Sequence, residues 1–150
     1  PRAGLGIVGD GPEHEKLKVK SEKLKVTEGA VFVGWQEDFI PYYKGADLYL
    51  LTSAFEGYAR TVIEAVAAGL PVVMTDVGVA GELIRDDETG RVVPVGDAGA
   101  LVLALTNARR DYPAMRQMAE RAQAEVLALE PRTWEEYIER YRDQFLVIGS

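Results

Sequence analysis

The sequence has no cysteine and only one histidine, His14, among its 150 residues. Without cysteine, the chain can form neither a disulfide scaffold nor a thiolate metal site. With one histidine, it cannot build a metal site on two imidazoles. His14 follows a glycine-rich turn, and we expect it to be a solvated residue of the helix that begins there.

Positive charge and long apolar runs are scarce as well. There are 17 Lys and Arg residues against 24 Asp and Glu residues, a formal net charge of −7, which argues against a nucleic-acid partner. No run approaches the roughly 18 apolar residues that a membrane span needs, and no signal peptide is visible. We therefore expect a cytoplasmic protein. Because the chain starts at Pro1 rather than Met, we also expect it to be part of a longer polypeptide.

The residues that are present predict one folded domain over 1–150, because 47% are hydrophobic and 27% are charged. Short β-branched runs without strict alternation predict strands covered on both faces, at 5–8, 31–33, 48–51, 72–74 and 91–93. Helical patterns lie between and after them, at 13–23, 39–44, 61–68, 81–84 and 98–108. This alternation predicts an α/β fold with a Rossmann-like, doubly wound parallel sheet.

The Ala-, Glu- and Arg-rich sequence of residues 113–146 predicts a helical C-terminal tail, broken at Pro131. Thr133 and Glu136 have the spacing of a capping box, which predicts a last helix over about 133–145. One apolar stripe follows that helix, formed by Trp134, Tyr137, Ile138, Tyr141 and Phe145. We expect this stripe to be partly exposed, as a surface for a partner.

Two segments are candidates for ligand binding. The first is the turn Gly9-Asp10-Gly11-Pro12, where a strand passes into a helix and backbone could approach a phosphate. A dinucleotide fingerprint counted from Gly9 would need glycine at position 14, where His14 stands. A tight turn without a ligand therefore remains an equal alternative.

The second candidate is the segment 53–73, which contains Glu56 and Glu64. Glu64 is the only charged residue between Arg60 and Asp76. The helix around it is so apolar that we expect the helix to be largely buried. A carboxylate buried there requires donors, either from the protein or from ligand hydroxyls such as those of ribose. Glu56 precedes this helix at the carboxyl end of a predicted strand, where open α/β sheets bind ligands.

Glu56 and Glu64 are separated by seven residues, within EGYARTVIEAVAAGLPVVMTDVG. Around them, in order, stand LGIVGDGP, VFVGW, YYKGADLYLLTSAFEG and GELIRDDETGRVVPVGD. In its E-x7-E spacing and in the order of these motifs, the sequence resembles the family 4 (group 1) glycosyltransferases. The resemblance implies the C-terminal half of a GT-B fold, in a retaining, metal-independent transferase with a nucleotide-diphosphate sugar as donor and no cofactor.

The resemblance also implies roles for single residues. Glu56 would be the catalytic-site carboxylate that contacts the donor sugar, and Glu64 would hold the ribose. The sugar and diphosphate would meet Gly57, Tyr58, Ala59, Arg60 and Thr61, and the nucleotide would be bordered by Gly9, Asp10, Gly11, Val33, Gly34 and Trp35. Ala59 stands where the family usually has Gly, so it would be strained if the backbone there needs a positive φ. A non-catalytic nucleotide-binding module and a nucleotide-sugar epimerase of GT-B type are the alternatives.

The resemblance places the first strand of this half, and the N-terminal GT-B domain, outside the chain. In a doubly wound sheet that first strand lies between 5–8 and 48–51. We therefore expect Ile7 and Leu50 not to pair with each other, and we expect the missing N-terminal domain or a strand-donating partner chain to fill the gap. Peripheral membrane association of the full enzyme is compatible with this reading.

Overall fold

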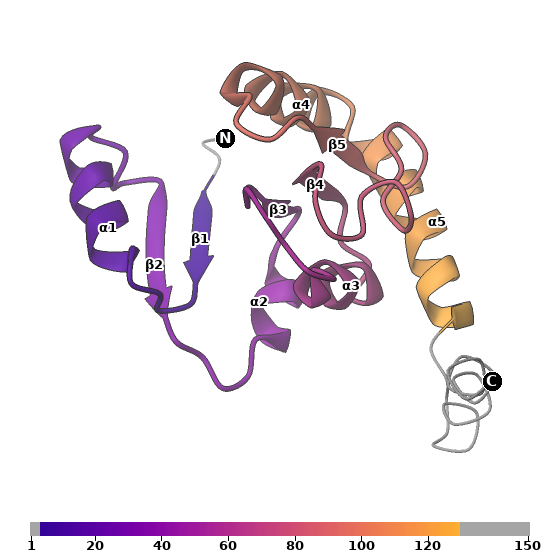
Figure 1. Ribbon diagram of the computed structural model, residues 1–150, viewed down its shortest axis with the longest axis horizontal. Helices are drawn as coiled ribbons and strands as arrows, with labels where there is room; N and C mark the ends of the chain where they lie inside the picture. The colour runs from indigo at the N-terminus through magenta and orange to yellow at the C-terminus, as the bar shows by residue number, and fades with distance from the viewer. Residues whose placement is uncertain (1–3, 130–150) are drawn as a thin grey trace, which may run out of the picture. The chain divides into compact units, whose positions relative to one another are not determined.

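The computed structural model describes residues 4–129. The chain forms two units, Pro1–Gly45 and Ala46–Ser150, whose elements are shown in Figure 1. The first unit contains β1 (Leu5–Val8), α1 (His14–Lys23), β2 (Ala30–Gly34) and α2 (Ile40–Gly45). The second contains β3 (Tyr49–Leu51), α3 (Arg60–Ala67), β4 (Val72–Thr75), β5 (Arg91–Val93), α4 (Ala98–Arg110) and α5 (Tyr112–Leu129).

In the first unit, β1 and β2 pair in parallel, with Ile7 opposite Phe32. His14, the first residue of α1, lies against this pair. Its Nδ1 is 3.2 Å from the carbonyl oxygen of Gly9, and its ring meets that of Phe32 edge-on, with centroids 5.4 Å apart. The prediction of a solvated His14 is therefore wrong. The side chain is largely covered because it turns back across the β1–α1 turn onto an aromatic neighbour.

The second unit is built on a parallel sheet with the order β3-β4-β5. Every residue of the central strand β4 is buried, and successive side chains of a strand point to opposite faces. Val72 and Met74 pack in one core with residues of α3 and α5, whereas Val73 packs in a second core with residues of α4. Figure 1 shows α3 and α4 on opposite sides of this sheet.

Helix α5 is tied to the segments beside it through their backbone carbonyls. Gln123 donates to the carbonyl of Ala67 at 2.8 Å, and Arg116 donates to that of Gly69 at 2.9 Å. Arg121 donates to the carbonyl of Glu88 at 2.7 Å. The first two bonds satisfy acceptors at the carboxyl end of α3, where helices leave carbonyls without partners. They hold α3 at the end opposite to the candidate site, whereas the third bond holds the segment between β4 and β5.

The α/β fold class is confirmed, and each of the five predicted strands is present. Within the first unit β1 pairs with β2, and within the second β3 pairs with β4. The expectation that Ile7 and Leu50 do not pair with each other stays a prediction. The helical tail is confirmed as far as Leu129. The helix predicted over 133–145 lies outside the described residues, and a single domain over 1–150 stays a prediction.

The helix predicted over 81–84 is wrong, since residues 81–83 form turns and Ile84 forms an isolated β-bridge with Ala80. Gly81 has φ +80°, outside the helical range, and its N–H donates forward to the carbonyl of Ile84 at 2.9 Å. Four residues make about one helical turn, too few to offset the cost of nucleating a helix.

An ion pair between Arg85 and Glu125 joins the segment after β4 to helix α5. Arg85 donates to both carboxylate oxygens of Glu125, at 2.6 and 3.1 Å. These bonds hold the pKa of the Glu125 carboxyl below its ordinary value. The resulting stability is present above the unfolded-state pKa and is lost as the pH falls through the lower folded pKa.

We expect Glu125→Gln to lower the free energy of unfolding by about 0.5–1 kcal/mol at neutral pH, the range for partly exposed pairs. At an acidic pH below the lowered folded pKa, the difference from the parent should vanish, because both chains then lack the charge. Urea unfolding at the two pH values measures this. Glu120→Gln, an exposed change on the same helix, is the control, and a loss that is the same at both pH values would contradict the prediction.

Candidate functional site

The loop between β3 and α3 carries Glu56 and is anchored to the end of the sheet. Thr75, the last residue of β4, donates its hydroxyl to the carbonyl of Ser53 at 2.7 Å. The Ser53 hydroxyl in turn donates to Oε1 of Glu56 at 2.6 Å. The Glu56 carboxylate is therefore oriented by a chain of two hydrogen bonds from β4. One of its oxygens remains for other partners of this half-buried side chain.

Ala59, the residue before α3, has a left-handed backbone with φ 49° and ψ 55°. Its side chain is buried beside Gly78, where an added Cβ would lie 2.8 Å from Cβ of Ala59 and 3.3 Å from Cβ of Glu56. The positive φ of Ala59 costs a non-glycine residue about 1–2 kcal/mol. This strain is located where the site loop meets the helix.

Helix α3 has one buried face and one exposed face. Val62, Ala65 and Val66 are buried, whereas Thr61 is exposed. Glu64 is half-buried. The prediction that the helix is largely buried is wrong, because α3 is buried on one face only. Helix α3 does not need to pack against neighbours on every face, because an exposed alanine side chain leaves little apolar surface in water.

Tyr49 connects the start of β3 to α3 and was missed by the sequence reasoning. Its hydroxyl donates to Oγ1 of Thr61 at 2.8 Å. Burial raises the pKa of the Tyr49 phenol, the bond with Thr61 lowers it, and the charges of Glu56 and Glu64 raise it further. Both carboxylates therefore lie close enough to the phenol to influence its charge. The sequence signal that could have pointed to Tyr49 is a polar aromatic residue in the strand just before the E-x7-E segment.

The remaining predicted contacts in this unit lie between the two glutamates. Gly57, Tyr58 and Arg60 are exposed at the start of α3. The amino end of a helix carries a partial positive charge of about one half and presents free N–H groups. The structure thus brings a held carboxylate, a helix amino end and a second carboxylate into one continuous segment.

In the first unit, the two predicted nucleotide segments meet directly. The N–H of Gly9 donates to the carbonyl of Gly34 at 2.8 Å, and both glycines have positive φ, +127° and +76°. Asp10 and Gly11 are exposed beside them, Val33 is half-buried, and Trp35 is 75% exposed. A tight turn without a ligand explains this geometry equally well, so the nucleotide contact of this segment stays a prediction.

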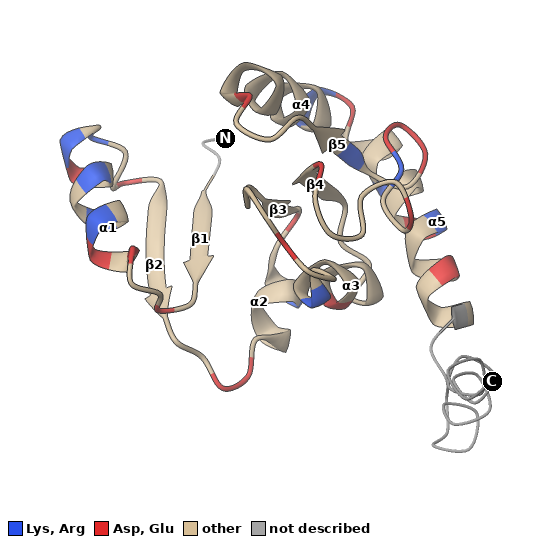
Figure 2. Cartoon of the chain, viewed as in Figure 1, with Lys and Arg blue, Asp and Glu red and all other residues tan. Residues whose placement is uncertain are grey.

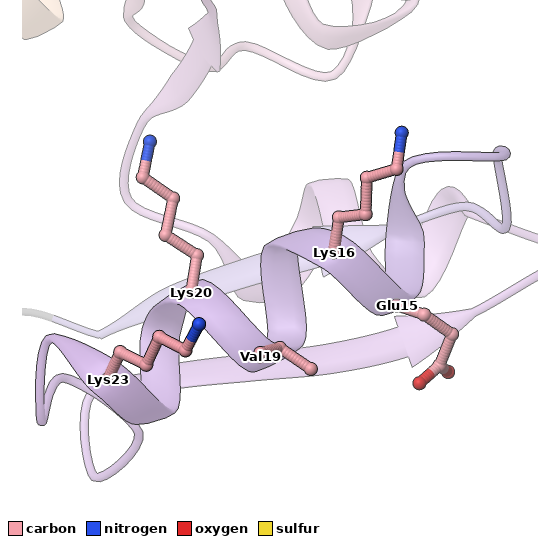
Figure 3. Close-up of a pocket in the computed structure, with 5 residues that line it drawn as sticks. All are labelled: Glu15, Lys16, Val19, Lys20 and Lys23. Atoms are coloured by element: carbon pink, nitrogen blue, oxygen red, sulfur yellow. The ribbon is translucent and has the colours of Figure 1, made fainter.

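Lysines gather on α1 (Figure 2), where a shallow open depression is lined by Glu15, Lys16, Val19, Lys20 and Lys23. Figure 3 shows the amines of Lys16 and Lys20 extending away from the helix. Within residues 4–129, no group of three or more Asp, Glu and His side chains is arranged to hold a metal ion. No helix in that range is long and apolar enough to cross a bilayer.

The fold and site define an α/β domain in which the loop that carries Glu56 lies at the carboxyl ends of parallel strands, the edge where open α/β sheets bind ligands. The sequence profile of the family "Glycosyl transferases group 1" matches residues 1–125, and the chain belongs to this family.

Curated relatives agree with this assignment. The chain is 31% identical over 121 residues to the lipopolysaccharide core biosynthesis glycosyltransferase LpsE of Rhizobium meliloti, covering 81% of this chain and 36% of that protein. It is 32% identical over 124 residues to the N-acetyl-alpha-D-glucosaminyl L-malate synthase of Bacillus anthracis, covering 83% and 32%. The chain thus spans about a third of the length of these relatives.

Solved structures share the fold. HepE of Anabaena, in complex with UDP, matches with a TM-score of 0.77 and 26% identity, covering 84% of this chain and 36% of HepE. Sucrose-phosphate synthase of Thermosynechococcus elongatus matches with a TM-score of 0.82 and 28% identity, covering 98% and 40%. The GT-B assignment of the fold is confirmed.

The contact between Gly78 and Ala59 gives a stability prediction. We expect Gly78→Ala to cost about 2–3 kcal/mol, from the positive φ and from the clash of its Cβ with Ala59. Gly96→Ala is the matched control, because Gly96 also has a positive φ but open space around its missing Cβ, and it should cost about 1 kcal/mol.

The double variant Ala59→Gly, Gly78→Ala tests the contact itself. The reference is Ala59→Gly alone, because that change by itself relieves the strain at residue 59. Gly78→Ala should cost less in this background than in the parent, as thermal or urea unfolding would measure. Equal losses for Gly78→Ala and Gly96→Ala, or an equal cost of Gly78→Ala in the two backgrounds, would contradict this account.

Proposed function

We propose that this chain is the donor-binding part of a retaining glycosyltransferase that transfers a sugar from a nucleotide-diphosphate sugar to an acceptor. The observation that carries this proposal is the arrangement of Glu56, held by Ser53 at 2.6 Å, ahead of a helix that carries Glu64. The UDP and UDP-glucose complexes of Anabaena HepE, 26% and 27% identical to this chain, support the donor class.

Each part of the segment suits one part of such a donor. The carboxylate of Glu64 can accept hydrogen bonds from the two ribose hydroxyls, a charge-assisted interaction. The amino end of α3 can face the diphosphate. The free oxygen of Glu56 can accept a hydrogen bond from a hydroxyl of the donor sugar, with the carboxylate kept in place by Ser53.

The chemical step requires stabilisation of the leaving group. When the bond between the sugar and the diphosphate breaks, negative charge develops on the departing phosphate oxygen. The aligned N–H groups at the start of α3 are oriented before the reaction, so they can stabilise this charge without reorganisation. We therefore propose that the diphosphate leaves without the help of a metal ion.

A non-catalytic nucleotide-binding module is the second candidate, because the segment could bind a nucleotide without transferring a sugar. The epimerase alternative has no observation in its favour.

We further propose that the whole protein is cytoplasmic, that an N-terminal GT-B domain completes it, and that it associates peripherally with a membrane.

Titration of the 150-residue chain with UDP tests the donor site. We expect saturable binding by calorimetry, with Glu64→Gln weakening it by about 1.5–3 kcal/mol through loss of charge-assisted hydrogen bonds to ribose. Glu120→Gln, exposed on α5, should bind like the parent. A folded Glu64→Gln chain with unchanged affinity would make Glu64 structural and remove its ribose role.

Metal independence has its own test. Because the helix amino end supplies the positive charge, we expect the dissociation constant for UDP to stay within about twofold when EDTA replaces Mg²⁺. Calorimetry in the two buffers measures this. Binding that disappears in EDTA and returns with added Mg²⁺ would overturn the metal-independent donor site.

A further inference from the structure

Nearly all the lysines of the chain stand in one short segment. Five of the six lie between positions 16 and 25, in α1 and the two residues after it. Within 13–26 these five lysines are opposed by three glutamates, which leaves a surplus of two positive charges, whereas the whole chain has a net charge of −7. The positive charge of α1 is therefore a local feature of an otherwise acidic chain.

Three of these lysines form a basic stripe along α1, made of Lys16, Lys20 and Lys23. With 3.6 residues per turn, their side chains lie within about 60° of one another around the helix axis. Ser21, the buried residue of α1, lies on the other side of the helix, and Glu15 lies about 100° to one side of the stripe. All three lysines are exposed, and Figure 3 shows the amines of Lys16 and Lys20 extending away from the helix.

The charges of the basic stripe are largely available to an external anion. Lys16 forms an ion pair with Oε1 of Glu13 at 2.7 Å, but both side chains are mostly exposed, so the pair is weak. Within residues 4–129, the side chains of Lys20 and Lys23 have no hydrogen bond or ion pair. Two of the three ammonium groups thus have water as their only partner in the described part of the chain.

Aliphatic side chains are exposed among these lysines. Val19 lines the same shallow depression as the basic stripe and is 45% exposed, and Leu24, just after the helix, is 63% exposed. The stems of the lysines are apolar as well, with the charge only at the tip. This face of α1 therefore combines positive charge with apolar surface that no other described part of the chain covers.

We propose that the basic stripe of α1, together with Val19, docks the protein on an anionic lipid surface. This inference rests on the proposed function in one respect, because it supplies the surface for the membrane association proposed there. Anionic headgroups attract basic side chains within a Debye length, about 8–10 Å at ordinary salt. Exposed apolar side chains of an interfacial helix enter the boundary between headgroups and acyl chains. A nucleic acid would engage the charges but leave Val19 and Leu24 in water.

Co-sedimentation of the 150-residue chain with lipid vesicles tests this surface. We expect binding to vesicles of equal parts phosphatidylcholine and phosphatidylglycerol at low ionic strength, and release by added salt. Vesicles of phosphatidylcholine alone should bind much less of the chain, because they lack the negative charge. Lys20→Gln combined with Lys23→Gln should lower the partition coefficient by about 25-fold, since each lysine near an anionic surface contributes about fivefold.

A matched control removes the same charge elsewhere. Lys44 and Arg110 are exposed outside the basic stripe, so Lys44→Gln combined with Arg110→Gln should change the partition coefficient by less than about twofold. Val19→Asn tests the apolar part of the surface. It should weaken vesicle binding at low and at high salt alike, because burial of an apolar side chain does not depend on charge.

The outcomes separate this inference from the proposed donor site. Equal losses for the two double variants, equal binding to the two kinds of vesicle, or tighter binding to a single-stranded RNA than to the anionic vesicles would overturn the inference. The lysine variants should bind UDP with the affinity of the parent, because the basic stripe lies outside the donor site. A parent chain that binds anionic vesicles but no UDP would overturn the donor-site proposal and leave the docking surface in place.

Discussion

The burial of β4 on both faces is the constraint on which the second unit depends. A strand with no exposed side chain must be covered twice, since its side chains alternate between faces. Val72 and Met74 require the cover of α3 and α5, while Val73 requires that of α4. The helices lie where they do because this one strand must be excluded from water.

The site is a consequence of the same arrangement. Thr75 ends β4 and holds Ser53, and Ser53 holds Glu56. The turn after β4 then brings Gly78 under Ala59 at the start of α3. A strained left-handed residue can persist there because packing on both sides determines its conformation. Site geometry and core packing are therefore parts of one structure, although the residues that carry the proposed chemistry lie at its surface.

Strands could be predicted from the sequence because each is a short β-branched run, and the family could be recognised from ordered motifs. Features set by distant contacts could not. His14 is covered by Phe32, which belongs to another element, and Tyr49 meets a residue twelve positions later. The error at 81–84 came from a local pattern overruled by Gly81 and its turn. The half-burial of Glu64 depends on which face of α3 meets the core, which the alanine-rich sequence does not specify.

Helix α5 holds its neighbours in a way that bears on how the family can diverge. Gln123, Arg116 and Arg121 donate hydrogen bonds to the backbone carbonyls of Ala67, Gly69 and Glu88. Every residue type has such a carbonyl, so mutation at positions 67 and 88 leaves these bonds available. Neutral drift can therefore change the side chains of the segments that pack beside α5. The three side chains of α5 still hold those segments through their backbone carbonyls.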